Sequence, residues 1–173
     1  MDARISEALD RITVDACEGL LESLGVEAHH LSTKNARSVG SNERIAVIGF
    51  GGESLRGSLV LDVPPSILTR THPSQSETDG DLEDWIGELS NLVLGRFKSK
   101  LLPFDVVIQL STPIVVRGKG TSIELSTGHS VVHTFSAEGA TFDVLLAADA
   151  EGELVLDGEP TREIESVEDM VFF

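Results

Sequence analysis

The stretch RIAVIGFGGESLRGSLVLDV, Arg44 to Val63, shows most directly how the chain folds. Two runs rich in Val, Ile and Leu, Arg44 to Phe50 and Leu55 to Val63, are separated by the turn sequence Gly51-Gly52-Glu53-Ser54. Short apolar runs bounded by turn residues are typical of β-strands, and a connection this short joins antiparallel neighbours. We therefore predict a β-hairpin here.

More strands are expected after this hairpin, each bounded by turn residues. They are Asp105 to Gln109, Ile114 to Arg117, Ser122 to Ser126, Ser130 to Phe135 and Thr141 to Ala147. Because the strands follow one another in runs and do not alternate with helices, the sheet is predicted to be mostly antiparallel.

Helices are expected on both sides of the hairpin in the sequence. Ile5 to Leu24 and Asp81 to Lys100 carry apolar residues at steps of three and four, the period of an amphipathic helix, and Ser66 to Thr71 follows two prolines that suit a helix start. The polar segments His29 to Glu43 and His72 to Asp81 are expected to be loops. The predicted fold class is α+β, a mostly antiparallel sheet with long amphipathic helices packed on it.

Length and charge exclude several classes of protein. The chain has 173 residues, which suits one domain, and a formal net charge of −16 from 13 Lys and Arg against 29 Asp and Glu. Nucleic acid and anionic membrane surfaces are not expected as partners, because the chain has no surplus of cations. No stretch approaches the roughly 18 apolar residues of a membrane span, and Met1-Asp2-Ala3-Arg4 is unlike a signal peptide, so a cytoplasmic protein is expected.

Cysteine, histidine and glycine offer little support for catalytic or metal chemistry. The single cysteine, Cys17, excludes an intrachain disulfide and a thiolate zinc cluster. His129 and His133 lie in or beside a predicted strand, where a four-residue spacing separates side chains by about 13 Å, so we expect no metal site. A zinc hydrolase built from the histidines stays a minor alternative. The segments Gly49 to Gly52 and Gly118 to Gly120 lack the spacing of phosphate-binding loops and are interpreted as hairpin turns.

The C-terminal end of the sequence is strongly acidic. Residues Asp149 to Phe173 include nine Asp and Glu and one Arg. We interpret 1–148 as a single domain and 149–173 as an acidic C-terminal segment, which includes one more short strand around Leu154 to Leu156.

The helix predicted from Asp81 to Lys100 has an organised polar side. At 100° per residue, Glu88, Asn91 and Gly95 fall together, opposite the broad apolar face. A carboxylate and an amide one turn apart thus project from a rigid element. Gly87 and Gly95 each cost a helix about 1 kcal/mol relative to Ala, which indicates close approach by a packed strand or by a partner. Spacing alone favours solvated helix residues and glycines that allow tight internal packing, because E-x-x-N occurs by chance in many helices.

Two longer strings, ELSNLVLGRFKSKL from Glu88 to Leu101 and IQLSTPIVVRGKG from Ile108 to Gly120, give this helix a context. With the hairpin IGFGGESLRGSLVLDVP, they resemble the CheX branch of the CheC/CheX/FliY chemotaxis phosphatases. That family has a G-E-x-x-N-x-x-x-G-like helix, matched here by Gly87, Glu88, Asn91 and Gly95, and then an S-x-P-x-V-x-x-G-like segment. The resemblance covers Arg44 to Leu146 and implies a CheC-like fold.

Members of this family hydrolyse the aspartyl phosphate of a CheY-like response regulator, and the resemblance implies the same activity here. Asn91 would orient the attacking water, and Glu88 would engage the active-site lysine of the regulator. The resemblance further implies no cofactor of the chain's own, Mg²⁺ on the regulator, one site per chain as in the CheX type, and a homodimer joined through the sheets. The alternative is a non-catalytic module that binds a receiver domain through the same helix.

Overall fold

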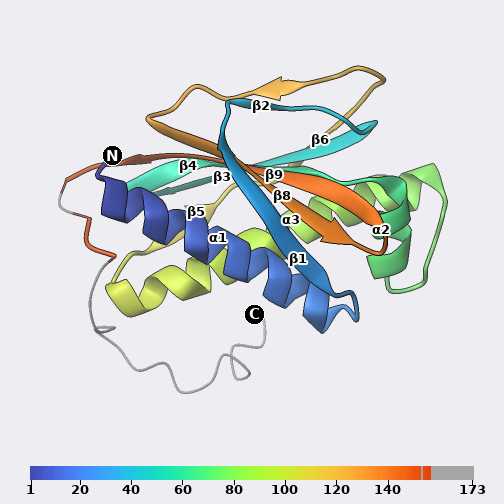
Figure 1. The fold of residues 1–173 in the computed structure, drawn as a ribbon, viewed down its shortest axis with the longest axis horizontal. Coiled ribbons are helices and arrows are strands. Elements are labelled where there is room, and N and C mark those ends of the chain that lie inside the picture. The colour runs from blue at the N-terminus through green and yellow to red at the C-terminus, as the bar shows by residue number, and fades with distance from the viewer. Residues whose placement is uncertain (153, 157–173) are drawn as a thin grey trace.

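The computed structural model describes residues 1–152 and 154–156, which form an antiparallel sheet with helices on one of its faces (Figure 1). In chain order the elements are α1 (Ala3–Ser23), β1 (Ala28–Asn35), β2 (Ser38–Val39), β3 (Arg44–Gly52), β4 (Leu55–Asp62), α2 (Pro65–Thr71), α3 (Asp79–Leu101), the 3-10 turn η1 (Leu102–Phe104), β5 (Ile108–Leu110), β6 (Ile114–Arg117), β7 (Ile123–Glu124), β8 (His129–Ala137) and β9 (Ala140–Ala150). The predicted α+β class is confirmed.

The main sheet has the strand order β1-β8-β9-β4-β3-β5, and β6 also pairs with β3. Every described pair is antiparallel. The predicted hairpin is confirmed as β3 and β4, with Phe50 opposite Gly57 near its turn. Because β3 is flanked by β4 on one side and by β5 and β6 on the other, the residues after α3 lie next to the hairpin.

Two apolar layers hold the fold together. Helices α1 and α3 pack on each other and on one face of the sheet, and the small β2–β7 sheet lies toward the other face (Figure 1). In the main core, Phe97 of α3 meets Phe50 of β3, with ring centroids 5.5 Å apart. A smaller cluster on the opposite face consists of Val39, Ile45, Val60, Val132 and Leu145. The amphipathic stripes of both long helices are therefore used for packing on the sheet.

Helix α3 begins two residues earlier than predicted, because Thr78 caps it. The Thr78 hydroxyl accepts a hydrogen bond from the Asp81 N–H at 3.3 Å. Acidic residues in the first turn and Lys98 and Lys100 in the last turn complement the helix dipole. The indole Nε1 of Trp85 donates to the buried Thr71 hydroxyl at 2.9 Å and so ties α3 to α2.

Some of the expected local structures are wrong. The segment His29 to Glu43, expected to be a loop, contains β1 and β2. Strand β1 is an edge strand with mostly exposed polar side chains, and its backbone pairs with β8, so no apolar alternation marks it. The strand expected at Asp105 to Gln109 begins only at Ile108, because Asp105 adopts a left-handed conformation with φ 58° after η1.

The end of the described chain packs on the core. Strand β9 runs to Ala150, and Leu154 and Leu156 are buried in the main apolar cluster. The strand expected around Leu154 to Leu156 is absent, since these residues have no regular secondary structure. Residues 153 and 157–173 of the predicted acidic segment lie outside the described residues, and the division at residue 148 stays a prediction. Among the described helices, none combines the length and apolarity needed to cross a membrane.

Candidate functional site

Helix α3 buries one side and presents Glu88 and Asn91 on the other. The buried residues are Leu82, Trp85, Ile86, Gly87, Leu89, Ser90, Val93, Leu94, Phe97 and Leu101. Glu88 is exposed, and Asn91 and Gly95 are partly exposed. Within the described part of the chain, neither the Glu88 carboxylate nor the Asn91 carboxamide has a hydrogen-bond or ion-pair partner. Both groups are therefore available to a molecule that approaches this side of the helix.

The two glycines of this helix lie in different environments. A Cβ atom on Gly87 would lie 3.5 Å from Val115 Cγ2 and 3.9 Å from Pro113 Cγ, which is ordinary van der Waals contact with the side chains of the segment after α3. A Cβ atom on Gly95 would have no neighbour within 4 Å. A packed strand therefore lies beside Gly87, but at a distance that does not require glycine, and nothing in the described chain accounts for Gly95.

The segment before β6 borders the same region of α3 and is anchored to β3. Gly49 N–H donates to Ser111 Oγ at 2.9 Å, and Ser111 N–H donates to the Gly49 carbonyl at 2.9 Å. These bonds fix the chain just before Pro113, which contacts α3 one turn ahead of Asn91. The helical turn before Asn91 is therefore packed against a segment that hydrogen bonds hold to β3.

An ion-pair network holds the first turns of α3 against the sheet. Arg117 of β6 bonds Asp79 at 2.6 Å and Glu83 at 2.9 Å, and the buried Arg44 of β3 bonds the second oxygen of Asp79. Hydrogen bonding and charge from Arg117 hold the pKa of Asp79 below its ordinary value, and Arg44 adds to the effect. Hydrogen bonds and charge from Asp79, and then from Glu83, raise the pKa of Arg117.

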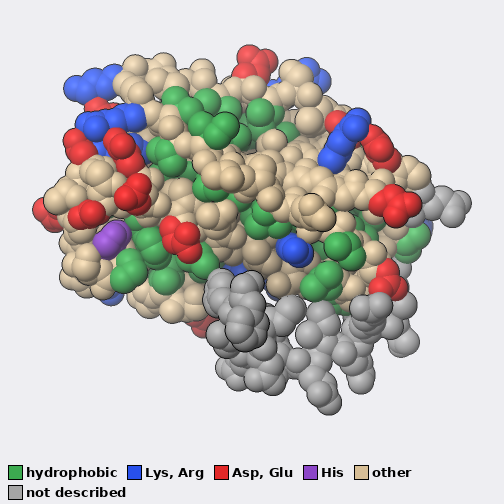
Figure 2. Space-filling view, turned by 180° about the vertical axis from the view of Figure 1, so that it is seen from behind, with side chains coloured by type: hydrophobic (Ala, Val, Ile, Leu, Met, Phe, Trp, Pro, Cys, Tyr) green, Lys and Arg blue, Asp and Glu red, His purple; other side chains and the backbone are tan. Residues whose placement is uncertain are grey.

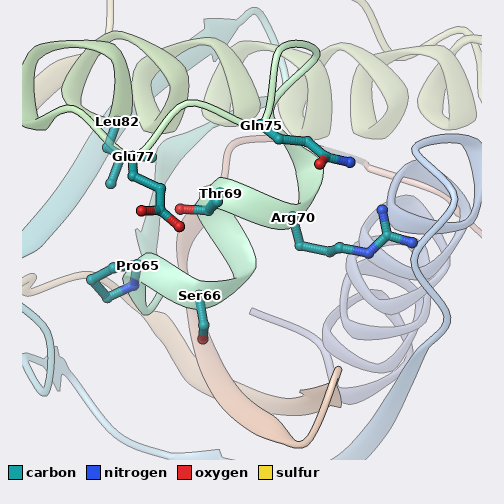
Figure 3. A pocket seen from close by; sticks show the side chains of 7 residues that line it. All are labelled: Pro65, Ser66, Thr69, Arg70, Gln75, Glu77 and Leu82. Atoms are coloured by element: carbon teal, nitrogen blue, oxygen red, sulfur yellow. The ribbon is translucent and has the colours of Figure 1, made fainter.

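A pocket of about 530 Å³ lies elsewhere, between α2 and the loop before α3 (Figure 3). Its lining includes Thr69, Arg70, Gln75 and Glu77. In Figure 3, the Glu77 carboxylate points toward Thr69, whereas Arg70 and Gln75 extend away from it. In most small-molecule sites a few polar groups converge on one point. The polar groups of this pocket do not. On the face shown in Figure 2, acidic, basic and apolar side chains lie next to one another.

The histidines of β8 are closer together than the strand spacing predicts. His129 Nε2 lies 2.8 Å and His133 Nε2 3.6 Å from the same Asp10 oxygen on α1, so both rings lean toward one carboxylate. Burial favours the protonated acid, but the interactions with His129 and His133 outweigh it, and the pKa of Asp10 lies below its ordinary value. His133 is fully buried, and its Nδ1 bonds Thr33 Oγ1 at 3.0 Å. In the described residues, no group of three or more His, Cys, Asp or Glu is arranged to hold a metal ion.

Sequence reasoning missed Asp10, Arg44, Asp79 and Arg117. Asp79 meets Arg44 and Arg117, and Asp10 meets His129, in each case from distant parts of the sequence. No local spacing marks these residues. The pairing of Arg44 with Arg117 would follow only from knowing that β6 returns beside β3.

Comparison with known proteins shows which family the chain resembles. A family model described as chemotaxis phosphatase CheX matches residues 44–136. No curated protein matches the chain.

Solved structures share the fold. A CheC-like superfamily protein from Shewanella sp. PV-4 is similar with a TM-score of 0.74 at 21% identity, over 86% of this chain and 99% of that chain. A chemotaxis protein CheX from Desulfovibrio desulfuricans is similar with a TM-score of 0.72 at 19% identity, over 82% and 99% of the two chains. A chain of the CheX–CheY–BeF3–Mg²⁺ complex from Borrelia burgdorferi has a TM-score of 0.64 at 16% identity, over 80% and 96%.

Proposed function

The chain belongs to the chemotaxis phosphatase CheX family, and on that basis we propose that it hydrolyses the aspartyl phosphate of a CheY-like response regulator. One observation carries the proposal: Glu88 and Asn91 project from the same side of α3, one turn apart, and neither side chain is engaged within the described chain. A site on the outward side of a helix, where Glu88 is exposed and Asn91 partly exposed, suits a substrate that is itself a folded protein. The similarity to a chain of a CheX–CheY complex supports the same partner.

Asn91 is the proposed catalytic residue. A carboxamide both donates and accepts hydrogen bonds and does not titrate, so it can hold a water molecule in one orientation without taking up a proton. Phosphoryl transfer depends mainly on positioning and on charge stabilisation. The water oxygen bonds to phosphorus as the bond to the aspartyl oxygen breaks, which releases inorganic phosphate and restores the carboxylate of the regulator. Asn91 supplies the alignment of that water.

Glu88 is the proposed orienting residue. Its carboxylate is exposed one turn before Asn91 and is free to pair with a lysine at the active site of the regulator. Such an ion pair would fix the orientation of the regulator on α3 and would place the Asn91 carboxamide next to the phosphoryl group. The chain needs no metal of its own in this scheme, because Mg²⁺ belongs to the regulator, where it neutralises charge on the phosphoryl oxygens.

Loss of phosphate from a radiolabelled receiver domain tests the assignment. We expect Asn91→Ala to slow the accelerated hydrolysis by about two orders of magnitude, the scale seen when one preorganised polar group is removed. Folding should persist, because the side chain is partly exposed and has no partner within the described chain. Equal rates for wild type and variant would refute the catalytic role. Binding of the receiver by the wild type without faster hydrolysis would instead identify a non-catalytic binding module.

We also propose a cytoplasmic homodimer, as the family resemblance implies. The main sheet ends in β1 on one side and in β5 and β6 on the other, so it has edges at which a second copy could pair. Sedimentation equilibrium of the whole chain tests this, and a monomer at all concentrations would refute the dimer.

A further inference from the structure

No contact within the described chain explains why residue 95 of α3 is a glycine. It lies well inside the helix Asp79–Leu101, where glycine costs about 1 kcal/mol relative to alanine. Glycine is usually retained in a helix where a neighbouring backbone approaches closely. At Gly87 the neighbours are the side chains of Val115 and Pro113, at ordinary contact distances of 3.5 and 3.9 Å from the position of a Cβ atom. At Gly95 a Cβ atom would have no neighbour within 4 Å among the described residues.

Gly95 lies on the side of α3 that carries the proposed site. Gly95 follows Asn91 by four residues, which on an α-helix places it on the same side about 6 Å further along the axis. Phe97 and Leu94 beside it are fully buried, so the orientation of this turn is fixed by the core. The bare backbone at Gly95 therefore continues the surface on which Asn91 lies.

Only the Cα side of Gly95 is open to a partner. Its carbonyl oxygen accepts a hydrogen bond from Ser99 Oγ at 3.0 Å, in addition to the N–H that an α-helix directs to each carbonyl from four residues ahead. With both lone pairs of that oxygen engaged, the Gly95 backbone itself offers a partner only van der Waals contact. The surface here suits another backbone or a flat side chain rather than a polar ligand.

We infer that Gly95 lies in direct backbone contact with the bound response regulator, so that the docking surface on α3 extends one turn beyond Asn91. This inference rests on the proposed function. The charges along the helix support one orientation of the partner, since Asp84 and Glu88 precede Asn91 whereas Lys98 follows Gly95. An acidic end, a neutral centre and a basic end favour a regulator whose charges run in the opposite sense.

A steric series at Gly95 tests the inference. Gly95→Ala and Gly95→Leu both favour the helix, and we expect each to raise the midpoint of thermal unfolding by about 2–4 °C. Both should nevertheless weaken binding to a CheY-type receiver loaded with Mg²⁺ and beryllofluoride. We expect the dissociation constant and the KM for the phosphorylated receiver to rise about threefold for Ala and about tenfold or more for Leu, because the larger side chain keeps the two backbones apart.

Gly80 offers a matched control in the first turn of the same helix. A Cβ atom on Gly80 also has no neighbour within 4 Å, but this residue lies far from Asn91 along α3. Gly80→Ala and Gly80→Leu should leave receiver binding at the wild-type level. Wild-type binding by Gly95→Leu would overturn the inference while leaving the phosphatase proposal intact. A wild-type chain that binds no loaded receiver would overturn both, whereas a loss of activity in Asn91→Ala with normal Gly95 variants would overturn the inference alone.

Discussion

Arg44 and Arg117 lie directly opposite each other on β3 and β6, and both guanidinium groups bond the carboxylate of Asp79. Two like charges on neighbouring strands are thus held together by one acid from the first turn of α3. Arg44 is only 4% exposed, and its Nε atom has no hydrogen-bond partner in the described structure. The orientation of the helix that carries Asn91 therefore depends in part on the charge of Asp79.

Asp79→Asn should make the stability of the protein less sensitive to acid. Arg117 and then Arg44 hold the pKa of Asp79 below its ordinary value of 3.8. The folded state therefore binds this proton less tightly than the unfolded chain, and the stabilisation is complete above pH 3.8 and lost as the pH falls through the lower, folded-state pKa. Urea unfolding over a pH series should show a variant that is less stable than wild type near neutrality and a difference that shrinks in acid. A difference that stays constant with pH would contradict this linkage.

Thr71→Val should destabilise the packing of α2 on α3. The Thr71 hydroxyl accepts the indole N–H of Trp85 at 2.9 Å, and valine would leave that buried donor unpaired. The expected loss is about 1–3 kcal/mol in the free energy of unfolding. Thr13→Val is the control, because the buried Thr13 hydroxyl only donates to the Leu9 carbonyl within its own helix. Chemical denaturation should show a clearly larger loss for Thr71→Val, and equal losses would contradict the role assigned to the hydrogen bond.

Glu88→Gln should weaken recognition of the phosphorylated receiver and leave the fold unchanged. The substitution keeps the shape of the side chain and removes the charge that is proposed to meet a lysine. We expect the KM to rise about tenfold, which corresponds to about 1.4 kcal/mol, and the effect to diminish as salt screens the pair. Glu7→Gln removes a charge from another exposed side chain, on α1, and should leave the KM unaltered. Initial rates against receiver concentration measure both, and an unchanged KM for Glu88→Gln would exclude the orienting role.

Leu156→Ala should show that the chain beyond β9 contributes to the stability of the folded core. Leu156 is 3% exposed in the main apolar cluster, whereas the neighbouring Val155 is 63% exposed. Truncation of the buried leucine should lower the free energy of unfolding by about 2–5 kcal/mol, and Val155→Ala should change it little. Denaturant unfolding of the two variants compares adjacent positions directly. Near-equal stability of both would place the boundary of the folded domain before this segment, close to the division predicted at residue 148.

Periodicity predicts those elements whose own side chains record which face is buried. The apolar steps of α1 and α3 and the hairpin of β3 and β4 are recognisable for this reason, and the placement of Glu88 opposite Phe97 follows from the helical repeat alone. Strand β1 was not predictable in the same way, because it is held by backbone pairing with β8 and its side chains are mostly polar.

Contacts between distant segments set a second limit on prediction. The leaning of His129 and His133 onto Asp10 depends on where α1 crosses β8, which no spacing within β8 reveals. The Glu88 and Asn91 pair could be proposed from the sequence because both belong to one helix. Its isolation from the rest of the chain became visible only in the structure.

Because Glu88 and Asn91 are isolated in this way, selection for a stable fold and selection for a binding partner act on different residues. Since Glu88 and Asn91 make no bonds within the described chain, they can be exchanged over generations without weakening the core beneath them. A duplicated copy of this protein could thus acquire a different signalling partner through a few surface substitutions while the β-sheet and its helices stay as they are.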